Sequence, residues 1–270
     1  MDASPPPILR RPTFLVGAIV VMGWLVVAVA WRWLGIDPFG DTGERLSPPD
    51  ADHWLGTDRI GRDVFARVLA GAEPVLVNAT AGTAIAMLLG TALGLVAGYR
   101  RGWVDQVLMR TFDVFLALPG IILLLVIVVA MGTSPGVLVL AIGVLFAPGI
   151  ARVVRAQVLV ETGKDYVTSA RAQGERGIRI VMSEILPNVW PHVLVQATLT
   201  VGAAVFMAAS LSFLGLAAAP PSPDWGLAVS ENRAYLQGAW WTLLFPALAI
   251  ASFVVSAALI GDHLTEMSRR

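Results

Sequence analysis

The chain has 270 residues, of which 56% are hydrophobic and only 14% are charged, with 19 basic and 19 acidic side chains. Soluble globular proteins carry about 25% charged residues, so this composition indicates a membrane protein. The balanced charge argues against a nucleic-acid partner, and the absence of cysteine excludes disulfides, thiolate metal sites and cysteine nucleophiles.

Six apolar runs approach the length of about 20 residues that a transmembrane helix requires. These runs are 13–34, 75–98, 111–132, 136–154, 193–216 and 241–261. They predict an all-α polytopic membrane protein with six transmembrane helices. With the N-terminus placed in the cytoplasm, 13 of the 19 lysines and arginines fall on the cytoplasmic side. This asymmetry favours cytoplasmic N- and C-termini.

A short amphipathic segment, 57–69, follows the first run on the outer side. Thr57 or Asp58 can cap a helix here, and its apolar residues recur at helical spacing. Asp63 and Arg67 are spaced for an ion pair one turn apart. We therefore expect a helix that lies in the outer membrane interface.

Glycines and prolines mark special positions inside the runs. Gly90, Gly94 and Gly98 repeat at a spacing that lets two helices approach closely, and we expect packing within the chain ahead of contact with another subunit. Kinks are expected where a proline removes a backbone donor inside an apolar run. The prolines in question are Pro119, Pro148 and Pro246, and whether their kinks serve gating is left open.

The longest cytoplasmic loop predicted by this topology is 155–192. Asp165 can cap a short helix that reaches Gln173, and Gly174 can end it. A second helix should follow, and Pro187 and Pro191 should end it before the fifth run. Its apolar face is predicted to hold Ile178, Val181, Met182, Ile185 and Leu186. Two interpretations compete, namely a helix pair that rests on the headgroups and a docking element for a cytoplasmic partner.

A family resemblance decides between them. The loop contains "DYVTSARAQG" followed by "IRIVMSEILPNVWP", which resembles the signature loop of inner-membrane permease subunits of ABC importers. Ala170, Gly174 and the run Ile185, Leu186, Pro187 match that signature, whereas Thr168-Ser169 stand where the family has glutamate and alanine.

The resemblance extends over most of the chain. Dipeptide and oligopeptide permeases contain segments similar to "HWLGTDRIGRDVFARVLAGA" (53–72), "LALPGIILLL" (116–125) and "LSFLGLAAAPPSPDWG" (211–226). The chain therefore resembles the permeases of the peptide/nickel branch of this family.

Several expectations are implied by this resemblance. The fold would be the type I ABC importer transmembrane domain in a bacterial inner membrane. Residues 1–73 would form the tail, first span and outer segment, and 74–270 a core of five helices with a coupling loop at 155–192. The partners would be a second permease, two ATPase subunits and an extracytoplasmic solute-binding protein, with lipid around them.

The resemblance also implies two groups of site residues. Those that couple to an ATPase subunit would be Thr168, Ser169, Ala170, Arg171, Gly174, Ile178, Ile185, Leu186 and Pro187. Those of the extracytoplasmic motif would be Gly56, Thr57, Asp58, Gly61, Arg62 and Asp63. For the outer segment, contact with the solute-binding protein is the alternative to a helix at the interface.

Catalytic motifs are absent from the sequence. The only lysine, Lys164, has no phosphate-binding loop before it, and the three histidines lack metal-ligand spacing. We therefore expect no enzyme activity and no cofactor in this chain, with ATP and magnesium bound by the ATPase partners. Di- or oligopeptides are the expected substrates, and nickel or another small solute is the alternative. A stand-alone secondary carrier is the rival from another class, although no acid lies at mid-span.

Overall fold

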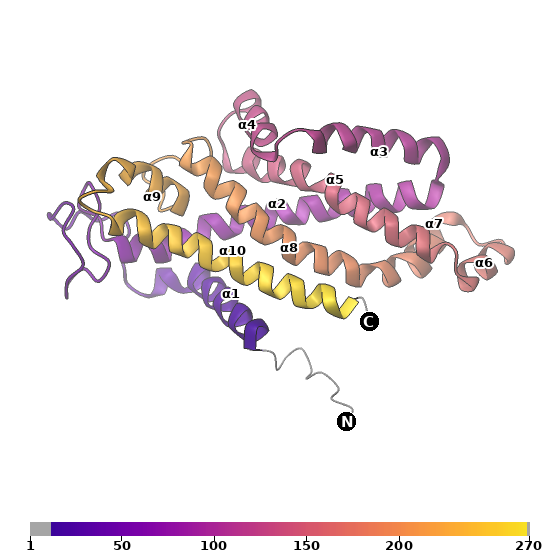
Figure 1. Ribbon diagram of the computed structural model, residues 1–270, viewed down its shortest axis with the longest axis horizontal. Coiled ribbons are helices and arrows are strands. Elements are labelled where there is room, and N and C mark those ends of the chain that lie inside the picture. The colour runs from indigo at the N-terminus through magenta and orange to yellow at the C-terminus, as the bar shows by residue number, and fades with distance from the viewer. Residues whose placement is uncertain (1–11, 269–270) are drawn as a thin grey trace.

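The computed structural model describes residues 12–268, which form helices and connecting loops with no β-strand in that range (Figure 1). Among these described residues, five helices are long and apolar enough to cross a membrane. They are α1 (Pro12–Ala30), α2 (Val64–Arg100), α5 (Pro135–Glu161), α8 (Leu186–Phe213) and α10 (Trp241–Ser268). The chain is thus an all-α membrane protein, as its apolar runs predict.

The third predicted span is broken. Two helices, α3 (Gly102–Ala117) and α4 (Gly120–Met131), meet at an angle of 94° and count as a sixth span only if taken together. Leu118 and Pro119 between them have extended backbones, with ψ of 138° and 125°. A residue before proline avoids the helical region, so the break begins one residue ahead of Pro119. The predicted span over 111–132 is therefore divided between two helices, and the kink predicted at Pro119 is a full break. Pro148 and Pro246 lie inside α5 and α10.

The helix expected at 57–69 is also not a separate element. Residues 57–63 form a turn closed by a bridge between Thr57 and Asp63, and α2 begins at Val64. Asp63 caps α2 by accepting a hydrogen bond from the Phe65 amide, which is the ordinary role of an acidic residue at this position. The second half of the expected helix is therefore the first turn of a transmembrane span.

Close packing of α2 on α5 forms a glycine seam along the middle of the bundle. A Cβ added at Gly82, Gly90, Gly94 or Gly98 would lie 2.6–2.7 Å from an isoleucine or valine carbon of α5. Such distances are too short for a side-chain carbon, so only glycine, whose side chain is a hydrogen atom, fits at these positions. The prediction that Gly90, Gly94 and Gly98 pack within the chain is confirmed, and Gly82 extends the same seam.

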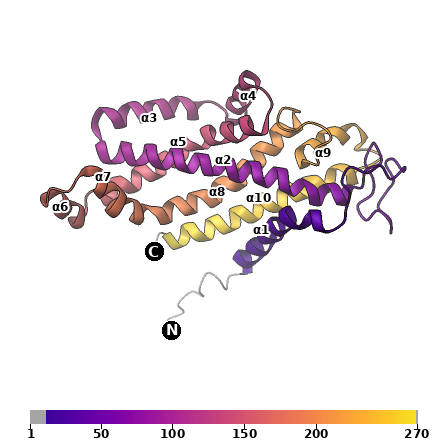
Figure 2. The same cartoon turned by 180° about the vertical axis from the view of Figure 1, so that it is seen from behind.

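The two ends of the bundle carry different segments (Figures 1 and 2). One end, called the α6 end, holds the α2–α3 turn and the short helix α6 (Asp165–Ala172). Arg101 donates to Thr162 Oγ1 at 2.8 Å there. The start of α1 and the last turns of α10 lie side by side short of this end, where Thr13 Oγ1 and His263 Nε2 are 2.7 Å apart. The opposite end, called the α9 end, holds the 34–63 loop and α9 (Trp225–Asn232). The division of the chain at residue 73 stays a prediction, and α2 runs across it.

Candidate functional site

Helix α6 projects from the end of the bundle between α5 and α8 (Figure 1). Val167 is fully buried and packs the inner face of α6 against the hydrophobic core. The helix begins one residue earlier than expected, because Lys164 is its cap and Asp165 is its first residue. The negative side chain of an acidic residue in the first turn is stabilised by the positive end of the helix dipole.

Gly174 ends α6 with φ of +78°, in the left-handed region expected from the sequence. The amides of Gly174 and Glu175 donate back to the carbonyls of Arg171 and Ala170. No atom lies within 4 Å of where a Gly174 Cβ would stand, so the backbone angle alone demands glycine. The result is a tight corner that fixes the direction in which α6 points.

The second half of the loop joins the fifth span without a stop. Short helix α7 (Gly177–Arg179) leads into the π-helical turn η3 (Ile180–Ile185) and then α8. Pro187 lies in the first turn of α8 and Pro191 lies inside it, so the predicted break is wrong. In a π turn, each backbone amide donates to the carbonyl of the fifth preceding residue. This altered hydrogen-bond pattern can compensate for the amide hydrogen that a proline lacks.

The predicted apolar face of this second helix is only half correct. Val181 and Ile185 are buried, whereas Ile178 and Met182 are 69% and 54% exposed. Ile180 is buried instead, because the π turn shifts the register of the face.

The proposed coupling residues divide into a surface and an anchor. Thr168, Ser169, Arg171, Gly174, Ile178 and Pro187 are exposed, and Ala170 and Leu186 are half-buried. Ile185 is fully buried, so within this chain its contribution is packing. Most of the exposed members lie in α6, at the Gly174 corner or in α7, where they are accessible to another protein.

A polar network fastens α6 to both neighbouring spans. Glu161, the last residue of α5, accepts from Lys164 Nζ at 2.8 Å and from the Tyr166 hydroxyl at 2.5 Å. Asn188 in α8 donates to the same tyrosine oxygen at 3.3 Å. Burial and the bond to the Glu161 carboxylate raise the pKa of the Tyr166 phenol to about 12. The tyrosine therefore stays a neutral donor, and the network links α6 to both α5 and α8.

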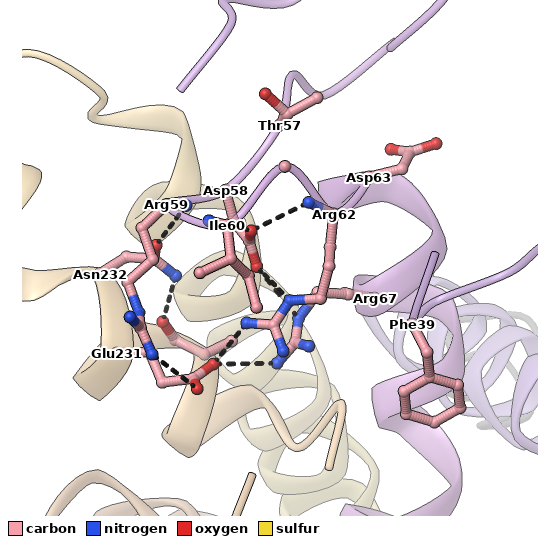
Figure 3. Close-up of polar contacts among 12 residues, drawn as sticks. Phe39, Thr57, Asp58, Arg59, Ile60, Arg62, Asp63, Arg67, Glu231 and Asn232 are labelled. Atoms are coloured by element: carbon pink, nitrogen blue, oxygen red, sulfur yellow. Dashed lines mark hydrogen bonds and ion pairs between the residues drawn. The ribbon is translucent and has the colours of Figure 1, made fainter. Parts of the chain in front are cut away.

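At the α9 end, the extracytoplasmic motif folds into a tight turn (Figure 3). Gly56 and Gly61 have φ of +75° and +85°. Asp58 is buried inside the turn, where one carboxylate oxygen accepts from the Ile60 and Arg62 amides, both at 3.0 Å. Its other oxygen accepts from Arg62 Nε at 2.7 Å.

Glu231 of α9 joins this turn to the span-five side of the bundle (Figure 3). Its carboxylate is 6% exposed and pairs with Arg62 at 2.8 Å, Arg67 at 3.3 Å and Arg59 at 3.4 Å. Asn232 accepts from the Arg59 amide at 3.3 Å. We call Asp58, Arg59, Arg62, Arg67 and Glu231 the arginine cluster. The cluster fastens the 34–63 loop to α9.

The predicted pair of Asp63 and Arg67 does not form. Asp63 is occupied as the cap of α2, and Arg67 turns to Glu231 and to the Ser222 carbonyl. Glu231 lies 164 residues from Arg67, so no local spacing could have revealed it.

Two tryptophans add hydrogen bonds at the α9 end, one from α9 and one from the start of α10. Trp225 donates to the Val68 carbonyl at 2.7 Å, and Trp241 donates to the Thr57 carbonyl at 3.2 Å. Asp224 caps α9 through the Leu227 amide, and burial raises the pKa of its carboxyl. Asp224 and Trp225 lie in the segment 211–226 that carries the family resemblance. The resemblance could therefore have pointed to these two residues, but not to the residues that they contact.

Across residues 12–268, no group of three or more histidine, aspartate or glutamate side chains could hold a metal ion. The charged side chains of the arginine cluster instead pair with one another, which suits a structural clamp.

Comparison with known proteins bears on both ends. Residues 90–269 match the model of the family described as binding-protein-dependent transport system inner membrane component. The chain is 38% identical over 93% of its length to a dipeptide transport system permease protein of Alkalihalophilus pseudofirmus, of which it covers 84%. It is 36% identical over 95% of its length to a probable D,D-dipeptide transport system permease protein of Escherichia coli, covering 87%. It is 39% identical over 96% of its length to a glutathione transport system permease protein of Pectobacterium atrosepticum, covering 87%.

Proposed function

Because the chain belongs to the family of binding-protein-dependent transport system inner membrane components, we propose that it forms half of a translocation pathway for di- or oligopeptides. Membership makes it a multi-pass inner-membrane permease of a peptide-type ABC importer, with the type I transmembrane fold. Permeases of this family are not themselves enzymes and work with other subunits of a transport system. The further partners would be a second permease subunit, two ATPase subunits that bind ATP and magnesium, and an extracytoplasmic solute-binding protein.

The single observation that carries the coupling role is the fastening of an exposed α6 to two spans. The exposed face around Gly174 offers a contact surface, and the Glu161–Tyr166–Asn188 network holds its base. An ATPase subunit that moves this face would therefore tilt α5 and α8 together. A helix pair lying idle on headgroups would need no such fastening.

The α6 end is proposed to face the cytoplasm, with both chain termini on that side. The majority of the arginines support this orientation. Single cysteines in this cysteine-free chain test it, because Gln173 and Thr42 are both exposed. Gln173→Cys should react with an impermeant maleimide only in inverted vesicles, and Thr42→Cys only in intact spheroplasts. The opposite pattern would place the proposed coupling surface on the wrong side.

Peptides are favoured as substrates by the names of the relatives, which include dipeptide and glutathione permeases. Nickel or another small solute is the second candidate from the same branch. Proteoliposomes that hold the assembled transporter and its binding protein distinguish the two through uptake of labelled dipeptide or of nickel.

The same proteoliposomes test the mechanism. Uptake should require internal ATP, and the purified chain alone should hydrolyse none. Uptake by the single chain under a proton gradient without ATP would instead establish a secondary carrier.

A further inference from the structure

A pocket at the α6 end lies between the last turns of α2 and the α7–η3 segment. Its volume is about 430 Å³. It is lined by Leu95, Val96, Tyr99, Arg100, Gly177, Ile178 and Val181. We call it the α2–α7 pocket. Ile178 is the one lining residue that also belongs to the proposed coupling residues, and none belongs to the Glu161 network or to the arginine cluster.

The floor of the pocket is apolar and close-packed. Leu95 and Val181 are buried, and the Tyr99 ring closes one side. A Cβ at Gly177 would stand 3.1 Å from the Tyr99 hydroxyl oxygen, so the tyrosine lies directly against this glycine. The cavity therefore has an apolar wall that can contact a hydrocarbon chain.

The pocket opens at the end of an exposed apolar stripe on α2. Ala84, Leu88, Ala92 and Val96 recur every fourth residue and are all exposed, with Leu88 73% and Val96 43% exposed. The next residue at this spacing is Arg100, which is exposed and lines the pocket. On a membrane-spanning helix, a stripe of this kind faces acyl chains and ends at the headgroups. Trp103, 76% exposed just beyond, marks the same depth.

Cations without acidic partners surround the mouth. Within residues 12–268, Arg100 and Arg176 form no ion pair, and Arg171 lies over the Tyr99 ring at 5.3 Å. Arg176 lines a second hollow, over residues 173–179, which shares Ile178 with the pocket. Glu175 is the only acid in this hollow and lies 3.8 Å from Arg179. The mouth thus carries an excess of positive charge above an apolar floor.

We propose that the α2–α7 pocket binds one anionic phospholipid. Its phosphate lies between Arg100 and Arg176, and one acyl chain follows the α2 stripe past Val96. Basic pockets between helices at a membrane surface recognise anionic headgroups in this way. A zwitterionic lipid would leave the excess positive charge unbalanced, and a soluble phosphate would leave the apolar floor exposed to water. The bound lipid would bridge α2 and α7 beside α6. This inference does not depend on the transported substrate.

Native mass spectrometry of the purified full chain tests the proposal. The chain is titrated separately with dioleoylphosphatidylglycerol and dioleoylphosphatidylcholine. Wild type should retain one phosphatidylglycerol in preference to phosphatidylcholine, and millimolar inorganic phosphate should not displace it. Equal retention of the two lipids, or displacement by phosphate, would overturn the proposal.

Variants locate the site. Each arginine near an anionic surface contributes about a fivefold gain in binding, so Arg100→Gln with Arg176→Gln should weaken phosphatidylglycerol binding by roughly 25-fold. Val96→Trp should fill the pocket and abolish the preference. Arg110→Gln removes an exposed arginine of α3 and is the matched control, which should bind as wild type does.

Two results would refute this location. One is that the Arg100/Arg176 variant binds phosphatidylglycerol as tightly as the Arg110 control. The other is that Val96→Cys in membranes of the assembled transporter cross-links to another subunit through a short bismaleimide, because a protein would then cover the stripe.

Discussion

Replacing Glu231 by glutamine should destabilise the protein strongly, because three arginines share its carboxylate. The carboxylate is 6% exposed, and Arg62 and Arg67 are 4% and 3% exposed. Glutamine keeps the shape but removes the charge, which leaves three guanidinium groups facing Asp58 alone. Breaking a buried ion pair by removing one partner costs about 3–5 kcal/mol. For a chain of this size, the melting temperature should fall by roughly 6–20 °C.

The assay is thermal unfolding of the purified protein followed by tryptophan fluorescence, since Trp225 and Trp241 lie beside the cluster. Arg32→Gln is the control, because its pair with Glu73 has side chains 66% and 31% exposed and should contribute at most about 1 kcal/mol. If Glu231→Gln melts within about 2 °C of the Arg32→Gln variant, the cluster does not clamp the outer loop to α9.

Three further substitutions test other parts of the structure. Gly174→Val should cost about 1–2 kcal/mol locally, because φ is +78° there, and should weaken capture of the ATPase subunit without lowering membrane abundance, whereas Gly174→Asn should retain capture. Normal capture by the valine variant would remove the corner from the coupling surface. Ala170→Glu adds a charge that docking must desolvate, so substrate-stimulated ATP hydrolysis by the assembled transporter should fall, and wild-type hydrolysis would favour the interfacial helix pair. Gly90→Ala places a methyl 2.7 Å from Ile150 and should cost about 1–3 kcal/mol in thermal unfolding; Gly149→Ala, with open space, should cost nothing, and equal melting of both would disprove the seam.

The apolar runs predicted the long helices well, because burial in lipid requires continuous hydrophobicity and leaves a direct trace in sequence. Breaks were harder to predict, since the same residue acts differently in different settings. Pro119 breaks a span, whereas Pro191 lies inside α8. The packing of neighbouring helices decides that difference, and it is a tertiary feature.

The candidate sites were predicted unequally for a related reason. Gly174 could be identified locally, because its backbone angle depends on its own turn. The partner of Arg67 could not, because a local spacing rule pointed to Asp63 while the structure pairs Arg67 with Glu231. Asp63 instead caps α2, and the Arg67 guanidinium pairs with Glu231, an acid that is distant in the sequence.

The glycine seam has a mechanical consequence. Sliding α2 along α5 by one residue, about 1.5 Å, would drive isoleucine and valine side chains into the α2 backbone. The two helices can therefore tilt together but cannot shear. Helix α5 ends at Glu161, which holds α6, and α2 starts beside Arg62 and carries Arg67. With 37 residues, α2 is about 55 Å long, so a tilt of about one degree at the α6 end displaces the arginine cluster by about 1 Å. Under the proposed coupling, the seam would let the two helices transmit a tilt from the α6 end to the α9 end as one rigid pair.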